Sequence, residues 1–333
     1  MRVAWLLLAA VPMFGAITGT VTNRTTGKPQ PGVTVAFNKL GQNGPELIDQ
    51  AKSDAQGHFT INQEVQGPMP FLIRAVYDGV NYNHMLPPGT PTTGISVDVY
   101  NASKQPGAAK ITKHMILFEP ANGQMTVSET YIVENGGNVA WNDADQGTVR
   151  FFLPPGAGGK AQVQATAPGG MPIGAGVLKT GKPDVLGVDF PVKPGETRID
   201  VTYSLPYTAG APFAGEIPSK DENTYLIAPN GVTLAGKGLN DLGTEPRTQA
   251  HIFGLPGRSY EITLTGAEAA GPSDASGGAD AESSGPQIEQ IMPRLYGQAK
   301  AIVGVALGIL GLGFALLYRK GSEGGPGGLP HKG

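Results

Sequence analysis

The sequence contains no cysteine, and this absence removes several classes of chemistry at once. Without thiols the chain has no disulfide framework, no thiolate-ligated zinc, no iron–sulfur cluster and no cysteine nucleophile. Charge is also scarce, because charged residues make up 15% of the chain and the formal net charge is −3. A nucleic-acid-binding surface needs a stripe of Lys and Arg, so we expect no nucleic-acid partner.

Residues that carry catalysis or bind metals are few and poorly grouped. The 5 histidines lie far apart in the sequence and none has the spacing of a zinc motif, so we expect no metal and no cofactor. Asp143 and Asp145 resemble part of a calcium loop, but the other ligands are missing and a hairpin turn explains them better. The sequence therefore predicts a protein that is not an enzyme.

Turn-forming residues, by contrast, are abundant. The chain has 50 glycines and 29 prolines, which separate short runs rich in Val, Ile, Thr and Tyr. This pattern predicts an all-β fold. With 333 residues the chain is long enough for about two domains, and we place two β-sandwiches at residues 17–105 and 106–265.

Both ends of the chain carry long apolar runs. Residues 3–14 follow a single Arg and precede small residues, which is the layout of a signal peptide over residues 1–16. The alternative is a retained anchor, although the run is short for a hydrocarbon layer of about 30 Å. Residues 301–318 are uncharged and contain 10 Ile, Leu, Val or Phe, and they are followed by Arg319 and Lys320. We expect a transmembrane helix over residues 299–318.

This arrangement predicts a single-pass membrane protein with its N-terminal bulk outside the cytoplasm and a cytoplasmic tail at residues 319–333. Residues 266–295 are rich in Gly, Ser, Ala and acidic residues, which predicts a flexible, disordered linker. Gly304 and Gly308 have the spacing that lets membrane helices approach closely. They are candidate helix-packing residues for a homodimer or a partner helix, and a lone anchor that tolerates glycine is the alternative.

Period-two patterns indicate the individual strands. In the first region we expect strands at 18–21, 33–37, 58–61, 71–77 and 95–100. In the second region we expect them near 111–118, 125–133, 149–153, 186–190, 199–205, 225–227 and 260–264. The continuous alternation in the second region is typical of an immunoglobulin-like sandwich.

A family resemblance rests on short motifs in the first region. The motifs are Gly19-x-Val21, Thr26-Gly27-Lys28-Pro29, Pro31-Gly32-Val33-x-Val35 and Asp54-x-x-Gly57-x-Phe59-x-Ile61. Residues 17–103 resemble the carboxypeptidase regulatory-like domain, a transthyretin-like (prealbumin-type) sandwich that is grouped with carbohydrate-binding-like folds. The resemblance implies an accessory, non-catalytic role for this region.

Candidate binding residues are few. We expect residues 81–84 to form a loop, in which Tyr82 and His84 are candidate ligand-recognition residues, with an ordinary solvated loop as the alternative. Trp141 is the one Trp that remains if the leader is removed. We expect a membrane-anchored binding or scaffold protein of the cell envelope whose partners are the lipid bilayer and envelope proteins or polysaccharide. The alternatives are a carbohydrate-binding surface module and an accessory subunit of a membrane complex.

Overall fold

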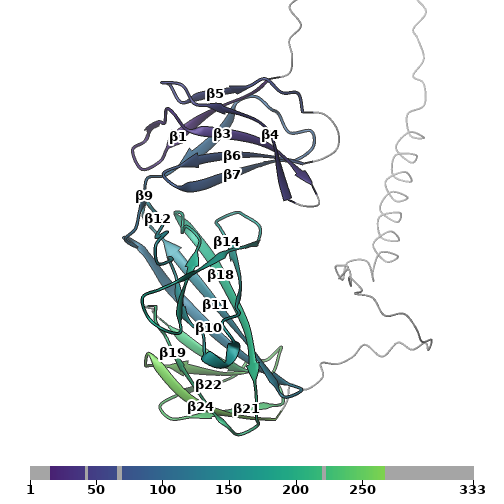
Figure 1. The fold of residues 1–333 in the computed structure, drawn as a ribbon, viewed down its shortest axis with the longest axis vertical. Helices are drawn as coiled ribbons and strands as arrows, with labels where there is room; N and C mark the ends of the chain where they lie inside the picture. Colours follow the sequence, from purple (N-terminus) through teal and green to yellow (C-terminus); the bar gives the residue numbers. More distant parts are fainter. Residues whose placement is uncertain (1–15, 42–43, 66–69, 220–222, 267–333) are drawn as a thin grey trace, which may run out of the picture. The chain divides into compact units, whose positions relative to one another are not determined.

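The computed structural model describes residues 16–41, 44–65, 70–219 and 223–266, and these residues form an all-β structure (Figure 1). In the described ranges the one helical element is a short 3-10 turn, Pro155–Ala157, and no helix there is long and apolar enough to span a bilayer. The predicted signal peptide except residue 16, the linker except residue 266, the predicted helix with Gly304 and Gly308, and the tail lie outside the described residues.

The first sandwich consists of two four-stranded sheets. One sheet contains β1 (Ile17–Asn23), β2 (Lys28–Pro29), β5 (His58–Ile61) and β8 (Ile95–Val99). The other runs in the order β4 (Gly44–Lys52), β3 (Thr34–Gly41), β6 (Phe71–Tyr77) and β7 (Val80–Leu86). The five predicted strands are confirmed. Strands β2, β4 and β7 were not predicted: β2 has two residues within a segment rich in turn formers, and polar residues interrupt the inward rows of β4 and β7.

The core between these sheets is formed by the inward rows of both. Large side chains that are almost fully buried in it are Ile17, Phe37, Phe59, Ile61, Ile73 and Leu86. Strand β1 alternates buried and half-buried positions along its whole length, as expected for a strand with one face on a core. The apolar alternation that identified the strands therefore also identified the core.

Two motif glycines in the first sandwich lie where another side chain would not fit. A Cβ atom on Gly19 would come within 2.2 Å of the Ile95 carbonyl oxygen and 2.6 Å of the Phe59 ring. Gly57 has φ +77°, and a Cβ atom there would lie 2.6 Å from the Val21 oxygen. These glycines permit close backbone packing between β1 and its neighbours and a left-handed turn before β5.

The second region contains one large sheet and two small ones. The large sheet has the order β15-β14-β18-β11-β10-β20-β23-β22, and the small sheets have the orders β13-β17-β16 and β19-β24-β21. The bounds in the large sheet are β10 (Ala109–Ala121), β11 (Gln124–Asn135), β14 (Gln162–Thr166), β15 (Ile173–Gly174), β18 (Gly195–Pro206), β20 (Thr224–Ala228), β22 (Asn240–Thr244) and β23 (His251–Leu255). Those in the small sheets are β13 (Arg150–Phe152), β16 (Gly176–Lys179), β17 (Val185–Asp189), β19 (Pro212–Glu216), β21 (Val232–Gly236) and β24 (Ser259–Gly266).

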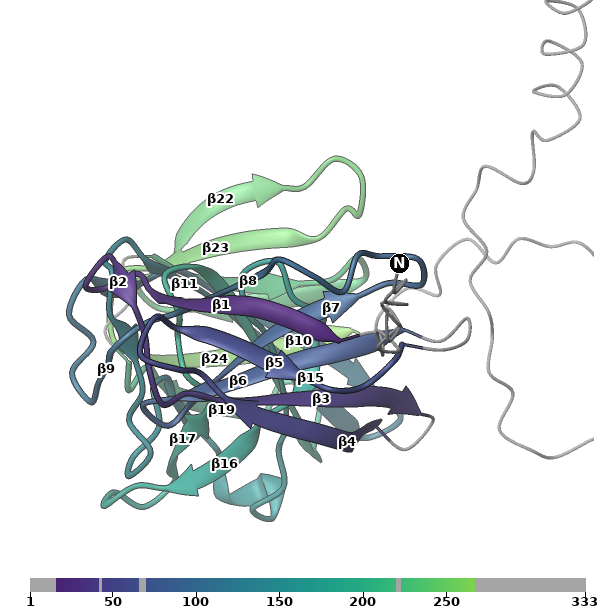
Figure 2. The same cartoon turned by 90° about the horizontal axis from the view of Figure 1, so that it is seen from above.

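One continuous buried cluster joins the large sheet to the small ones, so this region is a second sandwich. Its centre is formed by the long antiparallel strands β10, β11 and β18. All seven predicted strand positions in this region are strands, while the remaining strands of these three sheets were missed, namely β14, β15, β16, β19, β21, β22 and β23. Figure 2 shows the hairpin of β22 and β23 at the margin of the described chain, in line with its place at the end of the sheet. The immunoglobulin-like assignment stays a prediction.

A β-bulge changes the phase of β10. Ile111 pairs with Val133 and Lys113 pairs with Ile132, so Thr112 is an extra residue opposite a continuous partner strand. Because side chains alternate faces along a strand, an extra residue reverses the alternation. As a result, both Ile111 and His114 are buried in the core.

Two-residue strands connect the sandwiches. Strand β9 (Ala102–Ser103) pairs in parallel with β12 (Ala140–Trp141), and the N–H of Ala140 donates to the Asn101 oxygen over 2.8 Å. Ala140 is fully buried in the core of the first sandwich although it lies between strands of the second. The two regions thus share backbone hydrogen bonds and a small part of one core.

Candidate functional site

Tyr82 and His84 lie in strand β7 and not in a loop, so that part of the prediction is wrong. Tyr82 is a core residue with 5% of its surface exposed, and its hydroxyl donates to the Tyr100 carbonyl oxygen over 3.0 Å. Burial raises the pKa of the Tyr82 phenol. Its ring contacts the Nζ atom of Lys193, which lies 5.0 Å from the ring centroid. His84 is exposed, and a recognition role for it stays a prediction.

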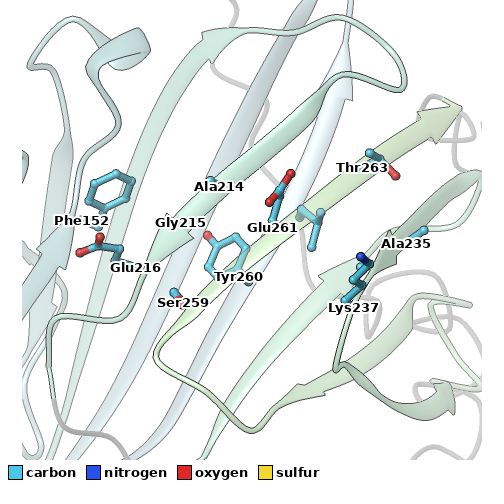
Figure 3. Close-up of a pocket in the computed structure, with 12 residues that line it drawn as sticks. Phe152, Ala214, Gly215, Glu216, Ala235, Lys237, Ser259, Tyr260, Glu261 and Thr263 are labelled. Carbon is cyan, nitrogen blue, oxygen red and sulfur yellow. The ribbon is translucent and has the colours of Figure 1, made fainter.

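The outer face of the small sheet β19-β24-β21 carries a hollow of about 700 Å³, which we name the outer hollow (Figure 3). Small residues on neighbouring strands form its floor, and polar side chains surround that floor. Its lining includes Phe152, Ala214, Glu216, Ala235, Lys237 and Glu261. Figure 3 shows Glu216 next to Phe152 at one end and Lys237 on the other side of β24.

Glycines on the edge strands shape the outer hollow. Gly215 pairs with Tyr260, and a Cβ atom on Gly215 would lie 2.3 Å from the Tyr260 ring. Gly236 is similarly close to Ile262, at 2.9 Å from its Cγ2 atom. The core side chains of β24 therefore occupy space that side chains of the neighbouring strands would otherwise fill. The remaining surface is shallow and open to solvent, and it suits contact with an extended partner.

A buried polar cluster lies in the core of the second sandwich. The carboxylate of Glu129 lies 3.0 Å from the Nε2 atom of His114 and accepts hydrogen bonds from the hydroxyls of Tyr131 and Tyr203, the latter over 3.2 Å. Exposure of His114 is 0% and that of Glu129 is 4%. The rings of His114 and Tyr131 stack with centroids 4.0 Å apart. We name these four residues the Glu129 cluster.

The Glu129 cluster influences tyrosines around it. Burial and then the nearby Glu129 charge raise the pKa of Tyr203 well above its ordinary value. The same two causes raise the pKa of Tyr260, which lines the outer hollow. Neither His114 nor Glu129 was among the candidate residues predicted from the sequence. The sequence feature that could have identified Glu129 is its place in the inward row from Met125 to Val133, in which the other residues are apolar or aromatic.

A second hollow, of about 680 Å³, lies where the connection between the sandwiches enters the second one, and we name it the basic hollow. Its lining includes Lys104, Gln105, Lys110, Trp141, Asp143, Thr148, Arg150, Ser219 and Arg258. Four of its 13 lining residues are Lys or Arg and one is acidic. The chain as a whole has 24 basic and 27 acidic residues, so this surface reverses the overall balance of charge.

Backbone contacts hold the walls of the basic hollow. Trp141 exchanges two backbone hydrogen bonds with Val192, over 2.9 and 2.8 Å, and its indole Nε1 donates to the Lys104 oxygen over 3.2 Å. The guanidinium of Arg258 donates to three consecutive carbonyl oxygens, those of residues 217, 218 and 219. Ser219 in turn bonds both backbone groups of Arg150.

Two acidic residues near the basic hollow pair with its cations. The Nζ atom of Lys104 lies 2.5 Å from Asp145, and this hydrogen bond raises the pKa of Lys104. Arg150 lies 3.7 Å from Asp143. The other oxygen of Asp143 accepts the backbone N–H groups of Asp145 and Gln146, so the segment is a turn. The prediction of a hairpin is wrong, because the flanking strands β12 and β13 pair with β9 and β17 and not with each other. Among the described residues, no group of three or more His, Cys, Asp or Glu could hold a metal ion.

No protein-family model matches the chain, and no curated protein matches it. Matching solved structures include two of an M1 zinc metallopeptidase from Deinococcus radiodurans, at 11% and 13% identity with TM-scores of 0.27 and 0.26. A third is a two-domain M1 zinc metallopeptidase bound to L-tryptophan, at 12% identity and a TM-score of 0.25.

Each of these matches covers 47% of this chain. The chain spans 42% to 43% of the length of the metallopeptidase chains. At these TM-scores the likeness carries no argument about fold or activity.

Proposed function

We propose that the chain is a membrane-anchored, extracytoplasmic binding or scaffold protein of the cell envelope and that it acts without catalysis. The observation that carries this proposal is the outer hollow, an open sheet face with a floor of small residues and a rim of mixed charge. Such a surface lets the backbone of a partner approach closely, while Glu216, Glu261 and Lys237 supply hydrogen-bonding groups around it.

The membrane-anchored topology rests on the two apolar runs of the sequence. An export leader at the N-terminus and a stop segment near the C-terminus would hold both sandwiches on the same, external side. We further infer that residues 17–103 form a carboxypeptidase regulatory-like domain. Supporting this, the motif residues Gly19 on β1 and Phe59 on β5 are paired across the sheet, and Gly57 lies in a left-handed turn before β5.

Two measurements test this function. Protease added to intact cells or spheroplasts is expected to digest the described region, and complete protection would contradict the topology. A photo-crosslinking residue placed at Ala214, inside the outer hollow, is expected to capture a partner in the native envelope. The control is the same residue at Leu242, which is 57% exposed and outside that hollow. Equal capture from both positions would contradict a role for the hollow.

A second candidate function is carbohydrate binding, which Trp141 favours. Trp141 is one of the residues that line the basic hollow, and hydroxyl, amide and charged residues line it as well. Aromatic side chains offer flat apolar surface next to polar groups, which is what a sugar ring needs. Titration of the full chain with soluble oligosaccharides, followed by Trp fluorescence, tests this candidate. A flat response to all of them would contradict it.

A further inference from the structure

We propose that residues 171–177, at an open rim of the second sandwich, dock on the surface of an anionic lipid bilayer. This inference rests on the proposed membrane attachment and adds the part of the external region that contacts the bilayer. It follows from three features: core-facing side chains that the core does not cover, a surrounding stretch without polar side chains, and neighbouring lysines that form no ion pair within the described chain.

Two side chains of this segment face the core but are not covered by it. Ile173 on β15 pairs with Ala165, and Val177 on β16 pairs with Val188, and both partners are fully buried. Residues paired across antiparallel strands have their side chains on the same face of the sheet, so Ile173 and Val177 also face inward. Their exposed fractions are nevertheless 51% and 39%.

The position of β15 and β16 explains this exposure. Strand β15 is the last strand of the large sheet, strand β16 is the last strand of a small sheet, and Ala175 joins the two. Figure 2 shows β16 at the margin of the described chain, where no further described strand covers the inward row. Met171, two residues before Ile173, is 67% exposed. The segment therefore presents three large apolar side chains to solvent.

The chemistry of the surrounding stretch favours lipid over a protein partner. Residues 167–178 consist of Ala, Pro, Gly, Met, Ile, Val and Leu alone. Protein interfaces carry regular hydrogen bonds and a polar rim, whereas the boundary between lipid headgroups and acyl chains accepts apolar side chains without such partners. Backbone groups on the open sides of β15 and β16 would stay unpaired in the hydrocarbon core, so the contact is at the level of the headgroups.

Lysines next to the segment favour anionic lipid. Lys160 precedes β14, Lys179 ends β16 and Lys182 follows it, and all three are exposed. Among the described residues none of the three forms an ion pair. The exposed acidic residues of the same stretch are Asp184 and Asp189, so cations are in excess there. Ammonium groups are attracted to an anionic bilayer, and their long side chains can reach the headgroups from an apolar contact.

The test uses the absence of cysteine, because a single introduced thiol is then the one site of labelling. Met171→Cys carries a polarity-sensitive fluorophore, and the matched control is Leu242→Cys, at a side chain that is 57% exposed. The full chain is reconstituted in phosphatidylcholine vesicles with or without phosphatidylglycerol and labelled from outside. Quenchers attached to the lipid are expected to quench the probe at position 171 on anionic vesicles and to leave the probe at position 242 unquenched.

Further variants, measured with the probe at position 171, separate the apolar and charged contributions. Lys179→Gln and Lys182→Gln are each expected to lower the ratio of docked to undocked copies by about two- to fivefold. Ile173→Gln is expected to lower it by about tenfold or more, because the apolar contact is lost. Lys237→Gln, in the outer hollow, is the charge control and is expected to leave the ratio unchanged.

A carbonate wash of the same vesicles tests the proposed anchor separately, since an inserted helix resists the wash and a surface contact does not. A resistant chain with an unquenched probe at position 171 would overturn the lipid contact in favour of a protein partner and leave the anchor in place. Quenching in a chain that the wash removes would support the contact and overturn the anchor. Equal quenching with and without phosphatidylglycerol would overturn the choice of anionic lipid, and equal quenching at positions 171 and 242 would overturn the location.

Discussion

The carboxylate of Glu129 on β11 lies 3.0 Å from the imidazole of His114 on β10, in a core that excludes both from solvent. Buried ionisable groups are costly unless every polar atom is paired, and the hydroxyls of Tyr131 and Tyr203 complete the set around this carboxylate. The cluster therefore makes the packing of three central strands depend on specific polar contacts as well as on apolar area.

Replacing Glu129 by Ala is expected to lower the free energy of unfolding by about 3–5 kcal/mol, because three buried donors would lose their acceptor. Urea unfolding of the full chain measures this cost. Glu134→Ala is the matched control, since Glu134 is exposed on the same strand and its loss is expected to cost within about 0.5 kcal/mol. Similar costs for the two variants would show that the Glu129 contacts contribute nothing specific.

Alkaline pH is expected to destabilise the second sandwich through Tyr203. The pKa of Tyr203 is raised in the folded state, so the unfolded chain releases this proton first as the pH rises above about 10. The folded state then binds more protons than the unfolded state, and stability falls with rising pH. Tyr203→Phe is expected to reduce the slope of unfolding free energy against pH above 10, whereas Tyr225→Phe, outside the cluster, should keep the wild-type slope.

Lys193 is expected to make the folded state more stable as the pH rises, over a range below the one in which Tyr203 acts. Burial lowers its pKa to about 8, so between pH 8 and 10 the folded state loses this proton while the unfolded state keeps it. Stability should then rise by about 1–2 kcal/mol from pH 7 to pH 9.5. Lys193→Met is expected to abolish this rise and the exposed control Lys179→Met to preserve it, as measured by urea unfolding. A wild-type curve that is flat over this range would contradict the assignment.

The close backbone contact at Gly57 gives a further prediction. Gly57 and Gly27 have similar φ angles of +77° and +71°, but only at Gly57 would a Cβ atom meet another backbone atom. Gly27→Ala is expected to cost about 1 kcal/mol from the left-handed conformation alone, and Gly57→Ala about 1–3 kcal/mol more. Thermal unfolding of the two variants measures the difference, and equal losses would show that the Val21 contact is relieved without cost.

The sequence was sufficient for the fold class and for most central strands, because apolar alternation reflects burial on one face. It was insufficient for β7, where His84 interrupts the inward row although Val80, Tyr82 and Leu86 are buried. The tight turn at Asp78 and Gly79 pairs that segment with the preceding strand β6, so the hairpin and not apolar alternation decides its structure.

The two hollows and the Glu129 cluster could not be predicted from the sequence either, because each depends on how the strands pack. The basic hollow joins Lys104, Trp141, Arg150 and Arg258, which come together only when strands of different sheets pack. His114 faces the core because of the bulge before it, and an uninterrupted alternation from Ile111 would have placed it outside. Motif spacing does not report contacts of this kind.

The extra residue in β10 also decides how this strand tolerates a change of length. Removing Thr112 would leave Lys113 as a single residue between Ile111 and His114, which restores ordinary alternation with both ends still facing inward. Removing a residue such as Leu117 would instead reverse the alternation in one half of the strand, so that its outward-facing residues would point into the core. A one-residue deletion is therefore compatible with the sandwich at Thr112 and incompatible with it a few positions further along.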